Sequence, residues 1–209
     1  YKTDDFNVGF SYRSKVKADI TGTAVGGAGL SAIDPTLVNV AGNVSTSITL
    51  PDMFSLGASF KATDSIIVSL QADRVNWSTF DQIELAFEPS RLNLLTGSTS
   101  TVPEGWKDVT TYRIGMEWAQ SETSRVRAGY VIDPTPTNPQ DLSPRLPGND
   151  RTLITLGYGQ DFSEAITMDL GYAYVKLKDR DLTTANKPIY NGTYTSVTHL
   201  FAASLNYHF

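Results

Sequence analysis

The chain has 209 residues, of which 40% are hydrophobic and 11% aromatic, so it is too apolar for a disordered segment and should fold. Its formal net charge is -5 and its 17 lysines and arginines are scattered, which argues against nucleic-acid binding. It contains no cysteine, which excludes a disulfide scaffold, and no apolar run approaches the roughly 20 residues of a membrane helix. If this chain crosses a membrane, it does so as strands.

The first predicted strand runs from Asp5 to Ile20, where apolar and polar residues alternate. Seven of the eight even positions are apolar, and none of the eight odd positions carries a large apolar side chain. A period of two marks a strand rather than a helix. The segment is far longer than the roughly 5 or 6 residues usual in soluble sheets, whereas about 9 to 11 tilted residues cross a bilayer. Its length therefore favours a membrane strand.

Seven further segments alternate in the same way, and no amphipathic helix of convincing length is present. In residues 47–61, Pro51 predicts a bulge or kink. In residues 66–87 the apolar positions change phase, which predicts a bulge between Arg74 and Phe80. A strand that ends on a carboxy-terminal aromatic residue, here Phe209, resembles the usual close of a bacterial outer-membrane β-barrel. The remaining predicted strands are residues 112–118, 125–133, 151–162, 166–174 and 194–209.

The connections between these strands alternate between long and short. A soluble β-sandwich has the same period of two, so alternation alone does not say which face points outward. Outer-membrane barrels have short periplasmic turns and longer extracellular loops, and the order of connections here fits that rule. The predicted long loops are residues 21–43, 88–106, 133–150 and 179–192, and the predicted short turns are residues 61–64, 120–124 and 161–164.

Aromatic residues at the predicted strand ends suit the two interfacial girdles of a membrane barrel. On the turn side they are Phe6, Phe60, Trp118, Phe162 and Phe209, and on the loop side Trp77, Tyr112, Tyr174 and Tyr194. The sequence thus predicts an all-β fold, an antiparallel transmembrane β-barrel with about eight strands present.

Several motifs closely resemble the outer-membrane long-chain fatty acid transporter (FadL) family in sequence, order and spacing. They are YRSKVKAD at residues 12–19, LPDM at 50–53, NWSTF at 76–80, PEGWKD at 103–108, YRIG at 112–115, RAG at 127–129, DP at 133–134 and PGNDR at 147–151. The resemblance extends over essentially the whole chain. It implies residence in the outer membrane of a Gram-negative bacterium.

The resemblance covers only the carboxy-terminal part of the family. Family members resemble fourteen-stranded barrels plugged by an amino-terminal hatch, so we expect residues 1–209 to be the last eight strands, without the hatch. The chain opens on Tyr1 with neither an initiating methionine nor a signal peptide, which also indicates a processed or truncated product. A self-contained eight-stranded barrel is the alternative, since both ends would lie on the same side. In the longer protein, the first strand would not close on the last.

The function that the resemblance implies is passive uptake of long-chain fatty acids or other hydrophobic compounds. A cation near the extracellular side would meet a carboxylate, and the candidates, all assigned to the polar face of the strands, are Arg13, Lys15, Lys17, Arg74 and Arg113. Pairing with Asp19, Asp73 or Glu117 inside the barrel is the alternative role for such cations. Trp77, Phe80 and Trp106 could line an apolar entrance, or could serve in a girdle or in loop packing. Since residues 88–106 carry only Arg91 as a base, with Lys107 just beyond, a neutral hydrocarbon is an alternative substrate.

Other functional classes fit poorly. The two histidines, His199 and His208, are not accompanied by a cysteine or a carboxylate cluster, so neither an enzyme nor a metal site is expected, and no cofactor is predicted. The competing function is an adhesin or a surface receptor that uses the long loops. Expected partners besides the hydrophobic ligand are outer-membrane lipid, lipopolysaccharide, and the barrel assembly machinery through the strand that ends in Phe209.

Overall fold

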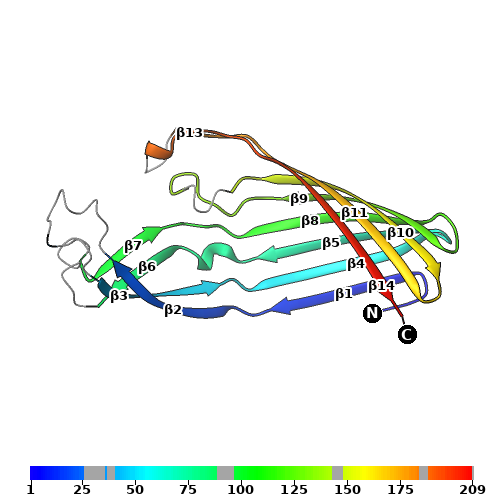
Figure 1. Ribbon diagram of the computed structural model, residues 1–209, viewed down its shortest axis with the longest axis horizontal. Coiled ribbons are helices and arrows are strands. Elements are labelled where there is room, and N and C mark those ends of the chain that lie inside the picture. The colour runs from blue at the N-terminus through cyan, green and yellow to red at the C-terminus, as the bar shows by residue number, and fades with distance from the viewer. Residues whose placement is uncertain (26–35, 37–40, 89–96, 143–147, 184–187, 209) are drawn as a thin grey trace.

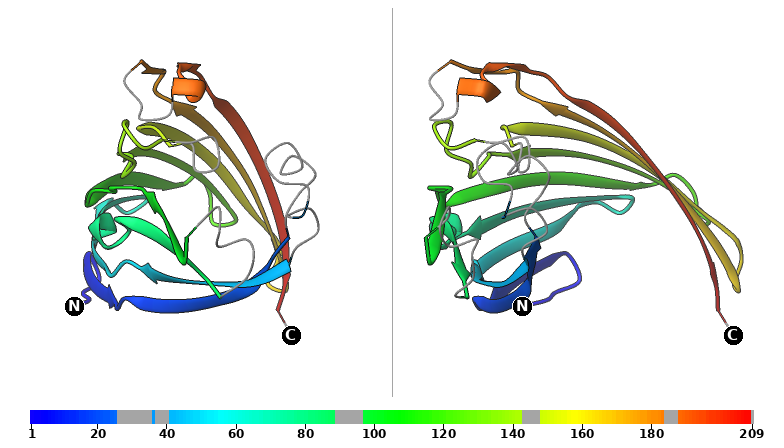
Figure 2. Two further views of the ribbon diagram at one scale, coloured as in Figure 1. Left: turned by 90° about the vertical axis from the view of Figure 1, so that its left-hand side faces the viewer. Right: turned by 60° about the vertical axis from the view of Figure 1, so that its left-hand side comes forward.

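The computed structural model describes residues 1–25, 36, 41–88, 97–142, 148–183 and 188–208. Within these ranges the largest element is an antiparallel sheet of eight strands, here called the barrel sheet, which curves as part of a barrel wall (Figures 1 and 2). The prediction of an all-β antiparallel fold with eight barrel strands is confirmed. In sheet order the strands are β1 (Phe6–Arg13), β4 (Met53–Thr63), β5 (Ile66–Val75), β8 (Val109–Ala119), β9 (Ser124–Asp133), β10 (Arg151–Ser163), β11 (Ile166–Leu177) and β14 (Val197–Tyr207).

Each barrel strand pairs with the next barrel strand along the chain. The connections between successive barrel strands alternate between long and short. The tight turns after β4, β8 and β10 lie at one end, together with the amino and carboxyl termini, and we call this the turn end (Figure 1). The opposite end is the loop end. Register shifts at Lys61/Thr63 and at Asp161/Ser163 place bulges at the turn end. Among the described residues β1 and β14 do not pair with each other, so both are edges of the barrel sheet.

A second sheet of four strands continues the barrel sheet at the loop end. Its strands are β2 (Val16–Val25), β3 (Ala41–Leu50), β6 (Gln82–Phe87) and β7 (Thr99–Pro103), and they extend β1, β4, β5 and β8 in the same order. The predicted loops at residues 21–43 and 88–106 are therefore partly strand. In the first of these loops alternation did not reveal the strands because their residues are mostly small or polar, as in Thr21 opposite Ser45 and Thr23 opposite Asn43. A short hairpin of β12 (Arg180–Leu182) and β13 (Gly192–Tyr194) begins in the predicted loop 179–192 and extends two residues beyond it.

The two sheets meet where all four strands are interrupted, and we call this level the junction. It comprises residues 14–15, 51–52, 76–81 and 104–108. Pro51 breaks the ladder between β3 and β4, as predicted, because proline lacks the amide hydrogen. The predicted phase change between Arg74 and Phe80 is a 3-10 turn, η3 (Trp77–Thr79), rather than a simple bulge.

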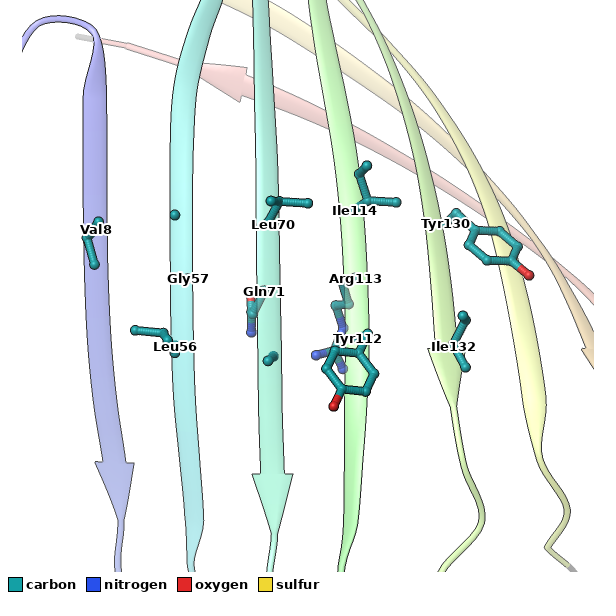
Figure 3. A pocket seen from close by; sticks show the side chains of 12 residues that line it. Val8, Leu56, Gly57, Leu70, Gln71, Tyr112, Arg113, Ile114, Tyr130 and Ile132 are labelled. Carbon is teal, nitrogen blue, oxygen red and sulfur yellow. The ribbon is translucent and has the colours of Figure 1, made fainter.

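The outer face of the barrel sheet is apolar and exposed. Phe10 is 67% exposed and Leu156 is 54% exposed, and Leu56, Leu70 and Ile114 are similar. A contiguous apolar surface of this kind covers far more than a soluble protein leaves in water, whereas a membrane barrel presents such a band to lipid. It is hollowed by a shallow groove of about 520 Å³ across β4, β5, β8 and β9, lined by Leu56, Leu70, Tyr112, Ile114 and Ile132 (Figure 3).

A helix long and apolar enough to cross a membrane is absent from the part of the chain that the structure describes.

Candidate ligand-binding site

The inner face of the barrel sheet carries a network of paired charges. Arg127 on β9 donates to Glu117 on β8 at 2.6 Å and to Asp169 on β11 at 2.8 Å, so this one guanidinium ties strands three positions apart. Arg125 forms two hydrogen bonds with Asp161, at 3.1 and 2.8 Å. Because each of these cations has a carboxylate partner, this part of the inner face is a polar surface with its charges already matched.

Glycines on β10 make this network possible. A methyl group added at Gly159 would lie 2.8 Å from Arg125 Nε and 2.8 Å from Asp169 Oδ1. A methyl group at Gly157 would lie 3.3 Å from the Cβ of Arg127. The two arginine side chains on β9 can therefore lie flat across β10 only because β10 has no side chain at these two positions.

Three aromatic residues pack together at the junction. Trp106 lies edge-on to Trp77, with ring centroids 4.9 Å apart, and edge-on to Phe80, at 4.8 Å. Such contacts place the positive ring edge against the negative ring face, which adds about 0.5–1.5 kcal/mol per pair to the burial of apolar area. Phe80 is nearly buried. The cluster joins η3 to the segment that links β7 and β8.

Carboxylates fix the irregular backbone around this cluster. Asp108 accepts a hydrogen bond from the Ser78 amide at 2.8 Å and pairs with Arg74 at 3.2 Å. The backbone hydrogen bond from Ser78, more than the Arg74 charge, holds the pKa of Asp108 below its ordinary value. Asp52 accepts from the Asn76 side chain at 3.1 Å, and Glu104 accepts from the Trp106 indole at 3.3 Å.

A pocket of about 320 Å³ lies beside the aromatic cluster at the loop end, and we call it the luminal pocket. Its apolar lining includes Val75, Trp77, Trp106, Val109 and Leu177. Its volume lies at the lower end of the roughly 300–1,000 Å³ usual for small-molecule sites. It can therefore hold a small apolar compound or one segment of a longer chain.

Polar groups enter the luminal pocket at one place. Arg151 Nε donates to Asp133 at 2.6 Å, and Thr111 Oγ1 donates to the other oxygen of Asp133 at 2.6 Å. Arg151 is mostly exposed, and its two terminal nitrogens make no hydrogen bond within the described part of the chain. A ligand oxygen in the pocket would thus meet a guanidinium that is partly neutralised by Asp133.

The structure brings together only some of the residues that the sequence suggested for ligand contact. Trp77 and Trp106 line the luminal pocket, and Phe80 packs behind Trp106. Arg13 at the end of β1, Lys15 at the junction and Lys17 on β2 are exposed and do not line this pocket, and Lys17 pairs with Asp19 at 3.3 Å.

Arg113 and Arg74 occupy opposite faces of the barrel sheet. Arg113 forms an ion pair with Asp73, which also accepts from Gln71 at 2.8 Å, so it takes part in the inner-face network. The assignment of Arg74 to the polar face is wrong. The β5 strand stays regular through Val75, so Arg74 shares the outer face with Leu70.

Two residues expected in the aromatic girdle lie elsewhere. Trp77 is inside the aromatic cluster rather than on the outer face, because η3 turns the chain at this position. Tyr194 belongs to the β12–β13 hairpin, where its hydroxyl donates to the Tyr190 carbonyl oxygen at 2.6 Å.

Several residues of the luminal pocket were not singled out by the sequence. Val75 looked like an ordinary strand residue, and Leu177 lay beyond the predicted strand 166–174. Asp133 and Arg151 lie within the DP and PGNDR motifs, which carried the family resemblance without a role being assigned to them. Their proximity follows from the pairing of Arg151 with Asp133 across β10 and β9, which one strand's alternation cannot reveal.

Comparison with known proteins gives a match over the whole chain. The family profile described as "Outer membrane protein transport protein (OMPP1/FadL/TodX)" matches residues 1–209. The Outer membrane protein P1 of Haemophilus influenzae is 27% identical, over 100% of this chain and 45% of that protein. A Long-chain fatty acid transport protein of Escherichia coli O6:H1 is 23% identical, over 84% of this chain and 40% of that protein.

Solved structures show the same fold. The crystal structure of a Pseudomonas aeruginosa FadL homologue superposes with a TM-score of 0.80 at 24% identity, covering 99% of this chain and 50% of that one. The Pseudomonas putida toluene transporter TodX gives a TM-score of 0.66 at 19% identity, covering 98% and 46%. The chain thus spans about half the length of the proteins that it matches.

Proposed function

Because the chain belongs to the outer membrane protein transport protein family (OMPP1/FadL/TodX), we propose that it forms part of a passive route for long-chain fatty acids or other hydrophobic compounds. The family resemblance expected from the motifs is confirmed, and so is the outer membrane of a Gram-negative bacterium as its location. The name of a relative, Long-chain fatty acid transport protein, supports transport of hydrophobic compounds as the activity. The substrate of this particular protein is part of the proposal.

The luminal pocket is the observation that carries this proposal. Its apolar lining and the edge-on pair Trp77 and Trp106 suit a hydrocarbon, and Arg151 with Asp133 offers a single polar contact. The pocket lies at the end of the sheet where the long connections gather, which is the extracellular end in outer-membrane barrels. A compound captured there would be shielded from water.

We also propose that the barrel sheet is one portion of a wider wall. The edges of β1 and β14 present backbone groups that are not paired with each other, and a strand edge in hydrocarbon costs several kcal/mol per unsatisfied group. Eight strands would enclose little more than packed side chains. The greater length of the matched proteins supports further strands, and a hatch, outside residues 1–209.

Uptake by cells that produce the full-length protein tests the transport function. Radiolabelled oleate and toluene should both enter faster than in cells lacking the protein, and Trp106→Ala should slow entry roughly three- to tenfold through the lost ring contacts. Phe162→Ala, on the outer face near the turn end, is the matched control and should leave entry unchanged. Equal uptake with and without the protein would rule out the transport proposal.

A surface-receptor role is the second candidate, favoured by the four-stranded sheet that projects beyond the barrel sheet at the loop end. Deleting residues 17–49 should abolish attachment of a phage or host cell without changing uptake, if this role is correct. Lipopolysaccharide and the barrel assembly machinery stay predicted partners. Phe209, which ends the strand expected to be recognised by that machinery, lies outside the described residues.

A further inference from the structure

Arg180 on β12 differs from the other arginines that the structure describes. Arg74, Arg113, Arg125, Arg127 and Arg151 each form an ion pair with a carboxylate. Two described arginines form none, and of these Arg13 is exposed whereas Arg180 is half-buried. A half-buried guanidinium without a carboxylate is unusual, because removing a charge from water is costly unless an opposite charge compensates.

The hydrogen bonds of Arg180 all go to neutral acceptors. One terminal nitrogen donates to Thr137 Oγ1 at 2.8 Å and to the Gly148 carbonyl oxygen, and the other donates to the Thr137 carbonyl oxygen at 3.4 Å. A guanidinium has five N–H donors, so two remain without a partner in the described ranges. Burial lowers the pKa of Arg180, and the more distant charge of Asp150 only opposes this shift. The cation thus keeps both charge and donors for a further acceptor.

A cavity of about 200 Å³ opens beside this guanidinium. Its walls include Leu142, which is 6% exposed, together with Leu177 and Tyr194, and its charged lining residues are Lys178 and Arg180. Among the residues that the structure describes, no aspartate or glutamate lines it. The cavity is therefore apolar with a positive side, the combination that suits the carboxylate end of an amphiphile. It is smaller than a typical ligand pocket, so it has room for the head group and a few carbons.

The cavity adjoins the luminal pocket. Gly148, Asn149 and Leu177 line both, so the two hollows are neighbours. A ligand chain that leaves the small cavity toward these residues would point to the pocket that contains Trp77 and Trp106. In the luminal pocket, by contrast, the guanidinium of Arg151 is already engaged by Asp133.

We propose that Arg180 and its cavity form a carboxylate-recognition site at the loop end, which holds the head group of a fatty acid while the tail points toward the luminal pocket. This inference rests on the proposed transport of hydrophobic compounds and adds a preference for acids over neutral compounds. Lys178 contributes positive potential at the cavity, and Tyr194 closes one side of it.

The competing explanation is a purely structural one, in which Arg180 ties β12 to the segment 133–150 through Thr137 and Gly148. The two explanations differ in what they predict for ligands. A structural tie affects acid and neutral ligands alike, whereas a recognition site affects only the acid. Binding of two compounds of equal chain length therefore separates them.

The test uses the full-length protein in detergent, with dodecanoate and dodecan-1-ol as probes at a pH where the acid is ionised. Titration of tryptophan fluorescence should give about tenfold tighter binding of dodecanoate, the value expected for hydrogen bonds to charged groups. Arg180→Gln should remove this preference and leave dodecan-1-ol binding unchanged, and Arg180→Lys should keep part of it. Lys61→Gln removes the same charge at the turn end and should change neither affinity.

Two results would overturn the proposal. One is an undiminished preference for dodecanoate in Arg180→Gln, and the other is an equal loss of both ligands, which would assign Arg180 to loop packing alone. The far-ultraviolet circular dichroism of each variant confirms that its barrel is folded. Failure of the transport proposal would be seen separately, as unchanged cellular uptake, while the binding preference could still be measured.

Discussion

The barrel sheet and the junction hold their polar groups in different ways. In the barrel sheet, charges are matched across strands, as Glu117, Arg127 and Asp169 are. At the junction, carboxylates also bond to backbone and to neutral side chains: Asp108 accepts from the Ser78 amide besides pairing with Arg74, and Glu104 accepts from the Trp106 indole. The regular region therefore offers a ligand few free groups. Aromatic rings and a pocket become available where the strand ladder stops.

The largest expected effect is a difference in cysteine labelling between the loop end and the turn end of the barrel sheet, which should face opposite sides of the membrane. We predict that Thr23→Cys, at the loop end, reacts with a membrane-impermeant maleimide on intact cells. Glu122→Cys, in a turn at the other end, should react only after permeabilisation, since short turns of outer-membrane barrels are periplasmic. Both variants are made in the full-length protein, and the reverse labelling pattern would invert the topology.

The next effect tests whether the two faces of the barrel sheet differ as described. Leu70→Arg should lower the free energy of unfolding by about 2–4 kcal/mol if the site lies near the bilayer midplane. Ser69→Arg, one residue away on the inner face, should cost much less because that face is already polar. Urea titration of tryptophan fluorescence in lipid vesicles measures both variants. Equal losses would mean that Leu70 does not face lipid.

A smaller loss is expected when the charge network is disturbed without removing a charge. In Gly159→Ala the added methyl group meets Arg125 and Asp169 at 2.8 Å, so these side chains must move. We expect a loss of about 1–3 kcal/mol, as for other overpacked positions. Gly9→Ala is the matched control, because nothing lies within 4 Å of its added methyl group. The same urea titration applies, and similar values for both variants would show that the contact is easily relieved.

The smallest effect belongs to the junction and depends on pH. The pKa of Asp108 is lowered in the folded protein, so its contribution is present above the ordinary carboxyl pKa of about 3.9. This contribution is lost as the pH falls through the lowered value. Asp108→Asn should therefore destabilise by at most about 1 kcal/mol at pH 7, and by progressively less as the pH is lowered and the carboxyl becomes protonated. A loss that stays constant with pH would mean that the charge of Asp108 contributes nothing.

The barrel sheet could be predicted from the sequence because each strand carries its own signal. Phe6, Phe10 and Tyr12 alternate with polar residues, and the structure places all three on the exposed face. Pro51 marked the break between β3 and β4 because proline has no amide hydrogen to donate, whatever its neighbours are. Such features can be predicted without knowing which strands pair with each other.

The candidate site was less predictable because it depends on pairings between strands. Thr111, Asp133 and Arg151 meet only through the register of β8, β9 and β10. Arg74 was assigned to the wrong face because the phase change was placed at residue 74, whereas β5 stays regular until η3. Arg180 lay in a segment expected to be loop, where alternation carries no information.

The order of strands in the barrel sheet has a consequence for how the wall is assembled. Every strand pairs with the barrel strand that precedes or follows it along the chain, so each pairing requires closing only one connection. The entropy lost on closing a connection rises slowly with its length, which makes successive hairpins the least costly units. The wall can therefore grow one hairpin at a time, with each completed edge serving as the template for the next strand. The last strand of the sequence, β14, depends for its place in the described part of this sheet on pairing with β11 alone.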